Sequence, residues 1–306
     1  MHPALILPSL RSNFGLFFDF EIRPARVCEQ HDPLAKRVGV ALAAKLVRGA
    51  LLSRIEFYVI LTTMSNGGVS GGKLILDIET VGVDFESLDH ATKDGLTRWI
   101  RKESDGEEEY RVALEELKDG LGFSPLTGEI VVVGVLDYHK NEGVVYFQAP
   151  GERHKEFSEE GITFKQLEEK EMLQKFWDGA RKYDYFVTFS GRSFDIPFLM
   201  IRSAAHGIRP SKDLMRGRYV YQQTPNAIHI DLQDQLSFYG ALRRKGSLHL
   251  WTRAFSIESP KAQGITGDDV GRLFKEKKFL DIAKYNVGDL RATRTLYEKW
   301  QNYLSF

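Results

Sequence analysis

Short apolar runs and longer amphipathic stretches alternate along most of this chain of 306 residues. The short runs are rich in β-branched and aromatic residues, a composition typical of strands. They predict five strands, at residues 73–79, 130–138, 144–148, 185–189 and 228–232. The second and third strands enclose the turn-like Lys140–Gly143 and therefore predict a hairpin. Helical spacing of apolar residues predicts helices over 164–183 and through most of the chain after residue 232.

Strands that alternate with helices are typical of the α/β class, so we predict a mixed five-stranded sheet flanked by helices. A charged, helix-prone stretch at residues 84–120 interrupts this order. Its acidic groups Glu107–Glu109 and Glu115–Glu116 lie among apolar residues at helical spacing. This pattern favours a solvated helical insertion over an acidic binding site.

The first 70 residues lack a clean periodicity and are predicted to be an irregular extension ahead of a single domain at residues 71–306. No uncharged run in them is long enough to cross a bilayer, and no stable membrane association is expected. Met64 is a candidate true start, which would make the preceding residues an over-long gene model. The alternatives are an amphipathic membrane-surface helix at residues 38–57 and a partner-binding arm. N-terminal sequencing of the native protein decides whether the chain starts at Met64.

Charge limits the kind of partner that this chain can hold. Residues 64–306 contain 34 Lys and Arg against 37 Asp and Glu, a slightly acidic balance. Binding of long nucleic acid through a broad basic surface needs many phosphate contacts, so that class of protein is disfavoured. An enzyme that grips a few terminal nucleotides is still allowed. Cys28 is the only cysteine, which predicts no disulfide framework and no thiolate metal site, and a reducing cytoplasm is the inferred location.

Two carboxylates end the first predicted strand. Asp77 and Glu79 are two positions apart, so their side chains point to the same face, roughly 7 Å apart at the backbone. The preceding run Leu74–Leu76 is apolar, so both acids are expected to be buried, at a cost unless something pairs with them. Taken alone, an Asp-x-Glu triplet is more often a solvated strand end.

Two further fragments carry acids that can join this pair. In Phe189–Pro197 a glycine turn leads from a strand into a helix that begins near Asp195, where a helix-favouring acid is the ordinary alternative. Tyr285 and Asp289 are four residues apart and share one helical face, where a surface pair is the alternative. Four converging carboxylates would repel one another without cations, so the ordered set predicts a divalent-metal site. Hard oxygen ligands favour Mg²⁺ or Mn²⁺.

With these fragments in this order, the chain resembles the DEDD superfamily of 3′-5′ exonucleases, which have a ribonuclease H-like fold. Within it, the chain is most similar to the predicted exonucleases related to the proofreading domain of family B DNA polymerases. The resemblance runs from about Leu74 to Trp300. Further segments that look like this group are His229–Leu232, Leu236–Gly240, Gly246–Leu248, Ser259–Lys261 with Gly264 and Gly267, and residues 292–300.

Carried over residue by residue, the resemblance implies five catalytic residues. Asp77 and Glu79 match the first exonuclease motif, Asp195 matches the second, and Asp289 matches the third. The four carboxylates would bind two Mg²⁺ ions, or Mn²⁺ in their place. Tyr285, four residues before Asp289, matches the tyrosine subtype, DEDDy.

The resemblance also implies substrate contacts at Thr80, Ser190 and Phe194. Ser190 departs from the asparagine that the family often has there, and the ring of Phe194 could stack on a terminal base. Asp231, at a predicted strand end, is either a residue that supports the metal ligands or a helix cap. The basic run Arg243–Lys245 is either a phosphate contact or a solvated loop.

The implied activity is hydrolysis at the 3′ ends of single-stranded nucleic acid, DNA in preference, with release of nucleoside 5′-monophosphates by a two-metal mechanism. Two alternatives stay open, a 3′-5′ exoribonuclease and a catalytically silent nucleic-acid-binding module. The expected partners are single-stranded or 3′-terminal nucleic acid, with polymerase or repair proteins acting in trans.

Overall fold

The computed structural model describes residues 71–258 and 264–305 of the chain. The predicted extension at residues 1–70, with Met64 and the candidate helix at 38–57, lies outside the described residues, as does the segment Ser259–Lys261.

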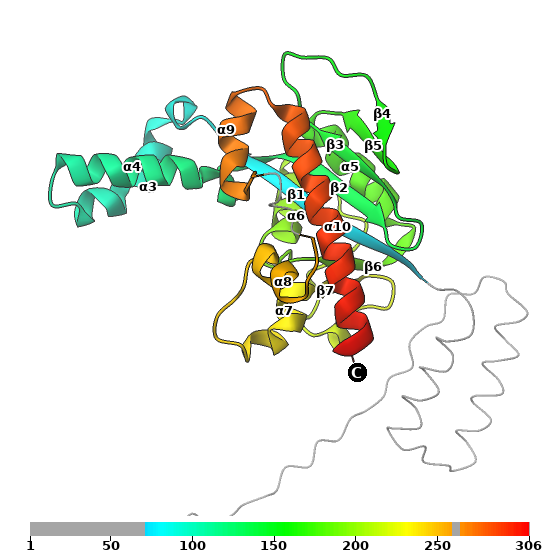
Figure 1. Cartoon of the computed structure of the whole chain (residues 1–306). Helices are drawn as coiled ribbons and strands as arrows, with labels where there is room; N and C mark the ends of the chain where they lie inside the picture. Colours follow the sequence, from blue (N-terminus) through cyan, green and yellow to red (C-terminus); the bar gives the residue numbers. More distant parts are fainter. Residues whose placement is uncertain (1–70, 259–263, 306) are drawn as a thin grey trace, which may run out of the picture. The chain divides into compact units, whose positions relative to one another are not determined.

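One mixed sheet of seven strands organises the described part of the chain, in the order β4-β5-β3-β2-β1-β6-β7 (Figure 1). The strands are β1 (Gly72–Gly82), β2 (Gly128–Asp137), β3 (Glu142–Phe147), β4 (Phe157–Glu159), β5 (Ile162–Gln166), β6 (Tyr183–Thr188) and β7 (Ile228–Asp231). The central β1 pairs antiparallel with β2 and parallel with β6, and β7 extends the parallel side. The predicted hairpin is confirmed as β2 and β3.

Helices cover both faces of this sheet. The helices of the described residues are α3 (His90–Glu103), α4 (Glu107–Gly120), α5 (Glu169–Ala180), α6 (Asp195–Ala205), α7 (Leu232–Leu236), α8 (Leu248–Ala254), α9 (Val270–Lys275) and α10 (Phe279–Tyr303), of which all but α3 and α4 lie against the sheet or its covering helices. Among the described residues, no helix has both the length and the apolar character needed to cross a membrane. The predicted α/β class, a mixed sheet flanked by helices, is confirmed and is consistent with a ribonuclease H-like fold.

The sheet has two strands more than the five predicted. The helix predicted from residue 164 begins only at Glu169, because residues 162–166 form β5 and pair in parallel with β3. The three-residue β4 then pairs with β5. Such short strands carry too few residues for a recognisable alternation, and their pairing with the sheet, rather than their own pattern, stabilises them.

Two separate clusters of buried side chains form the core, one on each face of the sheet. Leu74, Leu76 and Ile78 of β1 pack with α5 and α6 on one face. Ile75 and Val81 face the other way, toward the cluster that includes residues of α7, α9 and α10. Because side chains alternate along a strand, Asp77 and Glu79 share the face of Ile75. Figure 1 shows α10 crossing the sheet on that face.

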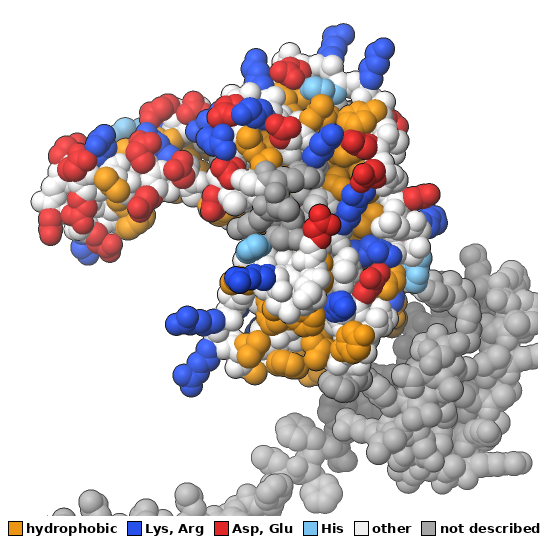
Figure 2. Space-filling model, viewed as in Figure 1, with side chains coloured by type: hydrophobic (Ala, Val, Ile, Leu, Met, Phe, Trp, Pro, Cys, Tyr) orange, Lys and Arg blue, Asp and Glu red, His pale blue; other side chains and the backbone are white. Residues whose placement is uncertain are grey.

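The helical insertion is confirmed as the pair α3 and α4, which stands away from the sheet (Figure 1). Acidic side chains cover much of it in Figure 2, and α4 buries none of its residues. Its exposed acids pair locally, as Glu108 does with Arg111 and Glu115 does with Lys118. The predicted solvated insertion therefore describes this pair of helices better than an acidic binding site does.

A buried ion-pair network fixes α6, the helix that begins at Asp195. Glu169, at the start of α5, accepts hydrogen bonds from the Ile130 N–H of β2 and from the guanidinium of Arg202, and its carboxylate also contacts His206. Burial alone would raise the pKa of Glu169, but these hydrogen bonds outweigh it and lower the pKa. The network therefore ties α5, α6 and β2 together.

Replacing Glu169 with glutamine is expected to lower the free energy of unfolding by about 2 kcal/mol, because Arg202 loses its charged partner in a mostly buried place. Chemical denaturation at pH 7 measures the loss. Glu156→Gln is the matched control, since its pair with Lys165 is exposed and should contribute less than about 0.5 kcal/mol. Because the pKa of Glu169 is lowered, its contribution is present above its ordinary pKa of 4.5 and is lost as the pH falls through the folded value. Equal losses in both variants would contradict this account.

Candidate active site

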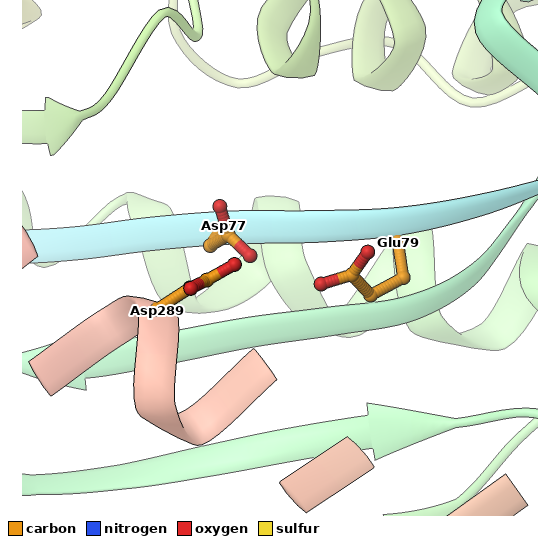
Figure 3. Close-up of side chains that lie close together, drawn as sticks. All are labelled: Asp77, Glu79 and Asp289. Atoms are coloured by element: carbon orange, nitrogen blue, oxygen red, sulfur yellow. The ribbon is translucent and has the colours of Figure 1, made fainter. Parts of the chain in front are cut away.

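Carboxylates from β1 and α10 meet on the α10 face of the sheet. Asp77 and Glu79 project from β1, and Asp289 projects from α10 toward them (Figure 3). One oxygen from each of the three lies within 4.8 Å of the others. We call these three residues the carboxylate cluster. The i and i+2 spacing on β1 and the position of α10 across that strand therefore bring together side chains that are 210 residues apart in the chain.

Asp195 reaches the same region from the other edge of β1. The pairing of β6 with β1 ends at the Ile75 and Val187 register, which leaves the later amides on this edge of β1 without a β6 partner. The Ile78 N–H donates to Asp195 Oδ1 at 3.1 Å. Asp195 is 4% exposed and is not a member of the carboxylate cluster. Its charge nevertheless helps to raise the pKa of Asp77. The structure thus gathers the four predicted acids into one region and places three of them in direct proximity.

Burial and the charges of neighbouring acids raise the pKa values of Asp77, Glu79 and Asp195. The pKa of Asp77 is raised well above its usual value by burial first and then by the charges of Glu79, Asp289 and Asp195. Burial and Asp289 likewise raise the pKa of Glu79. Burial raises the pKa of Asp195 to about 7, against backbone hydrogen bonds that lower it. A site that concentrates buried negative charge in this way favours a bound cation.

Tyr285 lies one helical turn before Asp289 and is 8% exposed. Burial, followed by the charges of Asp289, Glu79 and Asp77, raises the pKa of its phenol far above the ordinary value. Its hydroxyl is therefore protonated at any physiological pH and can act as a hydrogen-bond donor beside the carboxylates.

Asn286 is a member of this site that sequence reasoning did not assign. Its side chain is fully buried, and its Nδ2 donates to Asp77 Oδ2 at 2.7 Å. Gly134 of β2, directly opposite Asp77 in the sheet, provides the room, because a Cβ there would lie 1.8 Å from Asn286 Oδ1. The sequence did contain a signal for this contact, the glycine inside the apolar run 130–138. A glycine within a strand often marks a close approach by another element.

The three predicted substrate contacts have different surroundings. The Thr80 hydroxyl donates to the Gly122 carbonyl at 2.7 Å and so helps to anchor the end of β1. Ser190 adopts a left-handed backbone, with φ of 62°, at the turn between β6 and α6. The ring of Phe194 packs 5.1 Å from that of Phe198. Their contact with a substrate stays a prediction.

Asp231 acts as a helix cap and as a support for the turn before α6. Its carboxylate accepts the Gln233 N–H at the start of α7 and the N–H groups of Ser190 and Arg192. The helix-cap alternative for Asp231 is therefore confirmed, and the same carboxylate also holds the turn that leads to Asp195.

The family of the chain follows from a comparison with protein-family models. Residues 138–305 match the family described as predicted 3′-5′ exonucleases related to the exonuclease domain of PolB. The chain belongs to this family. The matched segment contains Asp195, Tyr285 and Asp289. Asp77 and Glu79 precede this segment, and only the fold brings them close to Asp289.

Comparison with solved structures finds a family B DNA polymerase from the hyperthermophilic archaeon Pyrobaculum calidifontis. The two are 16% identical with a TM-score of 0.45, over 76% of this chain and 25% of the polymerase chain. This exonuclease-family chain thus aligns with about a quarter of that polymerase. No curated protein matches it.

Proposed function

We propose that this chain is a metal-dependent 3′-5′ exonuclease that shortens single-stranded nucleic acid, DNA in preference, and releases nucleoside 5′-monophosphates. The observation that carries the proposal is the carboxylate cluster, with its ligand oxygens within 4.8 Å of one another, in a member of a predicted exonuclease family. Its donor set consists of hard carboxylate oxygens, which fits Mg²⁺ or Mn²⁺ better than softer metals. Acidic groups on the surface need no ion, because water solvates their charge. Glu79 and Asp195 lack most of that solvation, since they are 7% and 4% exposed.

Asp77, Glu79, Asp289 and Asp195 are the residues proposed to hold two divalent ions. Asp77 is the proposed shared ligand, because the charges of all three other acids act on it. Bound ions would supply a lowered pKa for an attacking water and charge neutralisation at the scissile phosphate. The Asn286 amide holds one oxygen of Asp77 and thereby sets the orientation of this carboxylate.

Tyr285 is proposed to orient the attacking water through its protonated hydroxyl. Its position one turn from Asp289 supports this role, as does its raised pKa. We also propose that the protein is cytoplasmic, as inferred from its single cysteine, and that it acts in trans beside polymerase or repair proteins.

The test is incubation of the purified chain with 3′-labelled and 5′-labelled single-stranded DNA, duplex DNA and RNA, with Mg²⁺, Mn²⁺ or EDTA. Stepwise shortening of single-stranded DNA from its 3′ end, blocked by EDTA, is the expected result. Faster shortening of RNA would favour the exoribonuclease. Binding of intact strands without cleavage under either metal would favour the silent binding module.

Tyr285→Phe isolates the role of the phenol, because it removes one oxygen and leaves every carboxylate in place. We expect kcat to fall about 10- to 100-fold, the range in which a positioned proton donor or water-orienting group contributes. The rise in melting temperature that Mg²⁺ causes should be the same as in the parent. A variant with unchanged kcat would remove Tyr285 from the mechanism.

A further inference from the structure

A second polar site lies at the carboxyl ends of β6 and β7. It is a hollow of about 180 Å³. This volume is below the roughly 300–1,000 Å³ of pockets that take drug-sized ligands, and it suits a group as small as phosphate. The lining residues, which we call the Arg192 hollow, are Ser190, Arg192, Ser193, Arg218, Asp231, Gln233, Asp234 and Lys245.

The charged side chains that line the Arg192 hollow leave a net positive charge for a ligand. Arg218 is engaged by Asp234 through two hydrogen bonds, at 2.7 and 3.1 Å. The carboxylate oxygens of Asp231 already accept three backbone N–H groups. In the part of the chain that the structure describes, Arg218 and Asp234 form the only ion pair within this lining. The lining thus contains three cations, Arg192, Arg218 and Lys245, against two carboxylates, and it keeps one unbalanced positive charge.

Two buried hydrogen-bond donors in the same lining have no partner. Arg192 donates through Nη2 to the Met215 carbonyl at 2.9 Å, but its Nη1 has no partner among the described residues. The same holds for Nε2 of Gln233, a residue that is 4% exposed. Buried donors without acceptors are costly, and folded proteins seldom keep them without a reason. A phosphate in the hollow would bring acceptor oxygens and the opposite charge to the side chains of this lining.

Arg218, which lines this hollow, also lies next to a group of aromatic rings. The Arg218 guanidinium lies 6.0 Å from the centroid of the Tyr239 ring, which in turn lies 4.7 Å from that of Tyr219. Tyr219 is stacked on Tyr221, and Tyr221 is 73% exposed. Exposed aromatic rings beside cations form the platforms on which single-stranded bases stack.

The backbone at Tyr239 and at its neighbour Phe238 is strained. Phe238 and Tyr239 both have a left-handed backbone, with φ of 50° and 56°. Consecutive left-handed residues that are not glycine are costly and tend to persist at functional sites. The ring of Phe238 is 54% exposed, so burial of this ring does not offset the cost of the strained backbone.

The loop between α7 and α8 contributes one cation, Lys245, to the lining of the hollow. It contains the basic run Arg243–Lys245, whose side chains are all exposed. Figure 2 shows Lys and Arg side chains projecting from this part of the molecule, at the lower left of the view. The structure thus places the last residue of this basic run in the lining of the Arg192 hollow.

We propose that the Arg192 hollow binds a backbone phosphate of the single strand whose 3′ end enters the carboxylate cluster, and that the exposed ring of Tyr221, backed by Tyr219, stacks on a neighbouring base. This inference rests on the proposed function. The connection between β6 and α6 links the two sites, because Arg192 lines the hollow and Asp195, three residues later, lies beside the cluster. The hollow would therefore extend the grip on the strand beyond its terminal nucleotide.

The test compares a substrate that reaches only the carboxylate cluster with one that reaches both sites. The first is the p-nitrophenyl ester of thymidine 5′-monophosphate, and the second is single-stranded DNA of about ten nucleotides. For Arg192→Gln, Lys245→Ala and Tyr221→Ala, we expect KM for DNA to rise about tenfold while KM for the ester changes less than about twofold. Each lost phosphate contact should also lower the salt dependence of DNA binding by about one unit of slope. The control is Arg243→Ala, which removes an equal charge outside the hollow and should match the parent.

Binding separates failure of this inference from failure of the proposed function. Fluorescence anisotropy with labelled single-stranded DNA in EDTA needs no catalysis. If the parent cleaves neither substrate but the three variants still lose binding relative to Arg243→Ala, the exonuclease proposal fails and the strand-binding hollow stands. If the variants bind and cleave DNA like Arg243→Ala, or lose ester and DNA activity equally, the hollow has no such role.

Discussion

Replacing Asp77 with asparagine is expected to lower nuclease activity at least about 10³-fold while the metal-free protein becomes more stable. Asp77 is the proposed shared ligand, and loss of a charged ligand removes several kcal/mol of stabilisation from the reacting phosphate. The asparagine has the same shape but no charge, so the repulsion from Glu79, Asp289 and Asp195 disappears. Release of 3′-terminal nucleotides measures the first effect, and thermal unfolding in EDTA measures the second.

Thermal unfolding also reports on the ions without any cleavage. Mg²⁺ or Mn²⁺ should raise the melting temperature of the parent, because an ion that binds only the folded state stabilises it, and should raise that of Asp77→Asn much less. The matched control is Asp281→Asn, an exposed acid in the first turn of the same α10. If Asp77→Asn kept more than a tenth of the parent activity, Asp77 would not be a shared ligand.

Replacing Gly134 with alanine is expected to cost about 3 kcal/mol of stability and most of the activity. The added Cβ would lie 1.8 Å from Asn286 Oδ1 and 2.8 Å from a methyl group of Leu290, so α10 must shift away from β2. Because α10 also carries Tyr285 and Asp289, this shift would move two of the five proposed catalytic residues. Chemical denaturation and single-turnover cleavage measure the two losses.

A double-mutant cycle tests the cause of this loss. Asn286→Ala removes the atom that clashes, so adding it to Gly134→Ala should restore at least half of the lost stability. Activity should stay low, because Asp77 would lose its hydrogen bond from Asn286. The control is Gly95→Ala on α3, where a Cβ meets nothing within 4 Å and a better helix former should be neutral or stabilising. Additive losses at Gly134 and Asn286 would contradict the packing described here.

Several elements of the site could be predicted because their geometry is local. The alternation of side chains along a strand places Asp77 and Glu79 on one face, and helical spacing does the same for Tyr285 and Asp289. These two pairs were predicted from spacing, and the structure places them together on the α10 face of the sheet. That they bind metal and cleave nucleic acid stays a prediction for the experiments above.

Other features have no local pattern that could reveal them. The strands β4 and β5 are too short to show an alternation, and the partner of Gly134 is an asparagine 152 residues later in the chain. The basic run Arg243–Lys245 allowed a phosphate contact or a solvated loop, and only the fold places Lys245 in one lining with Arg192 and Gln233. In each case the deciding contact joins segments far apart in sequence.

The sequence by itself determined the class of fold, the order of the acidic motifs and the faces on which their side chains lie, because backbone geometry repeats every two residues in a strand and every 3.6 in a helix. Only the tertiary structure decided that α10 crosses the face of β1 that carries Asp77 and Glu79, that Asn286 orients Asp77, and that Arg192, Gln233 and Lys245 line one hollow. These depend on which distant side chain fills each space between packed elements, and no local periodicity encodes that choice.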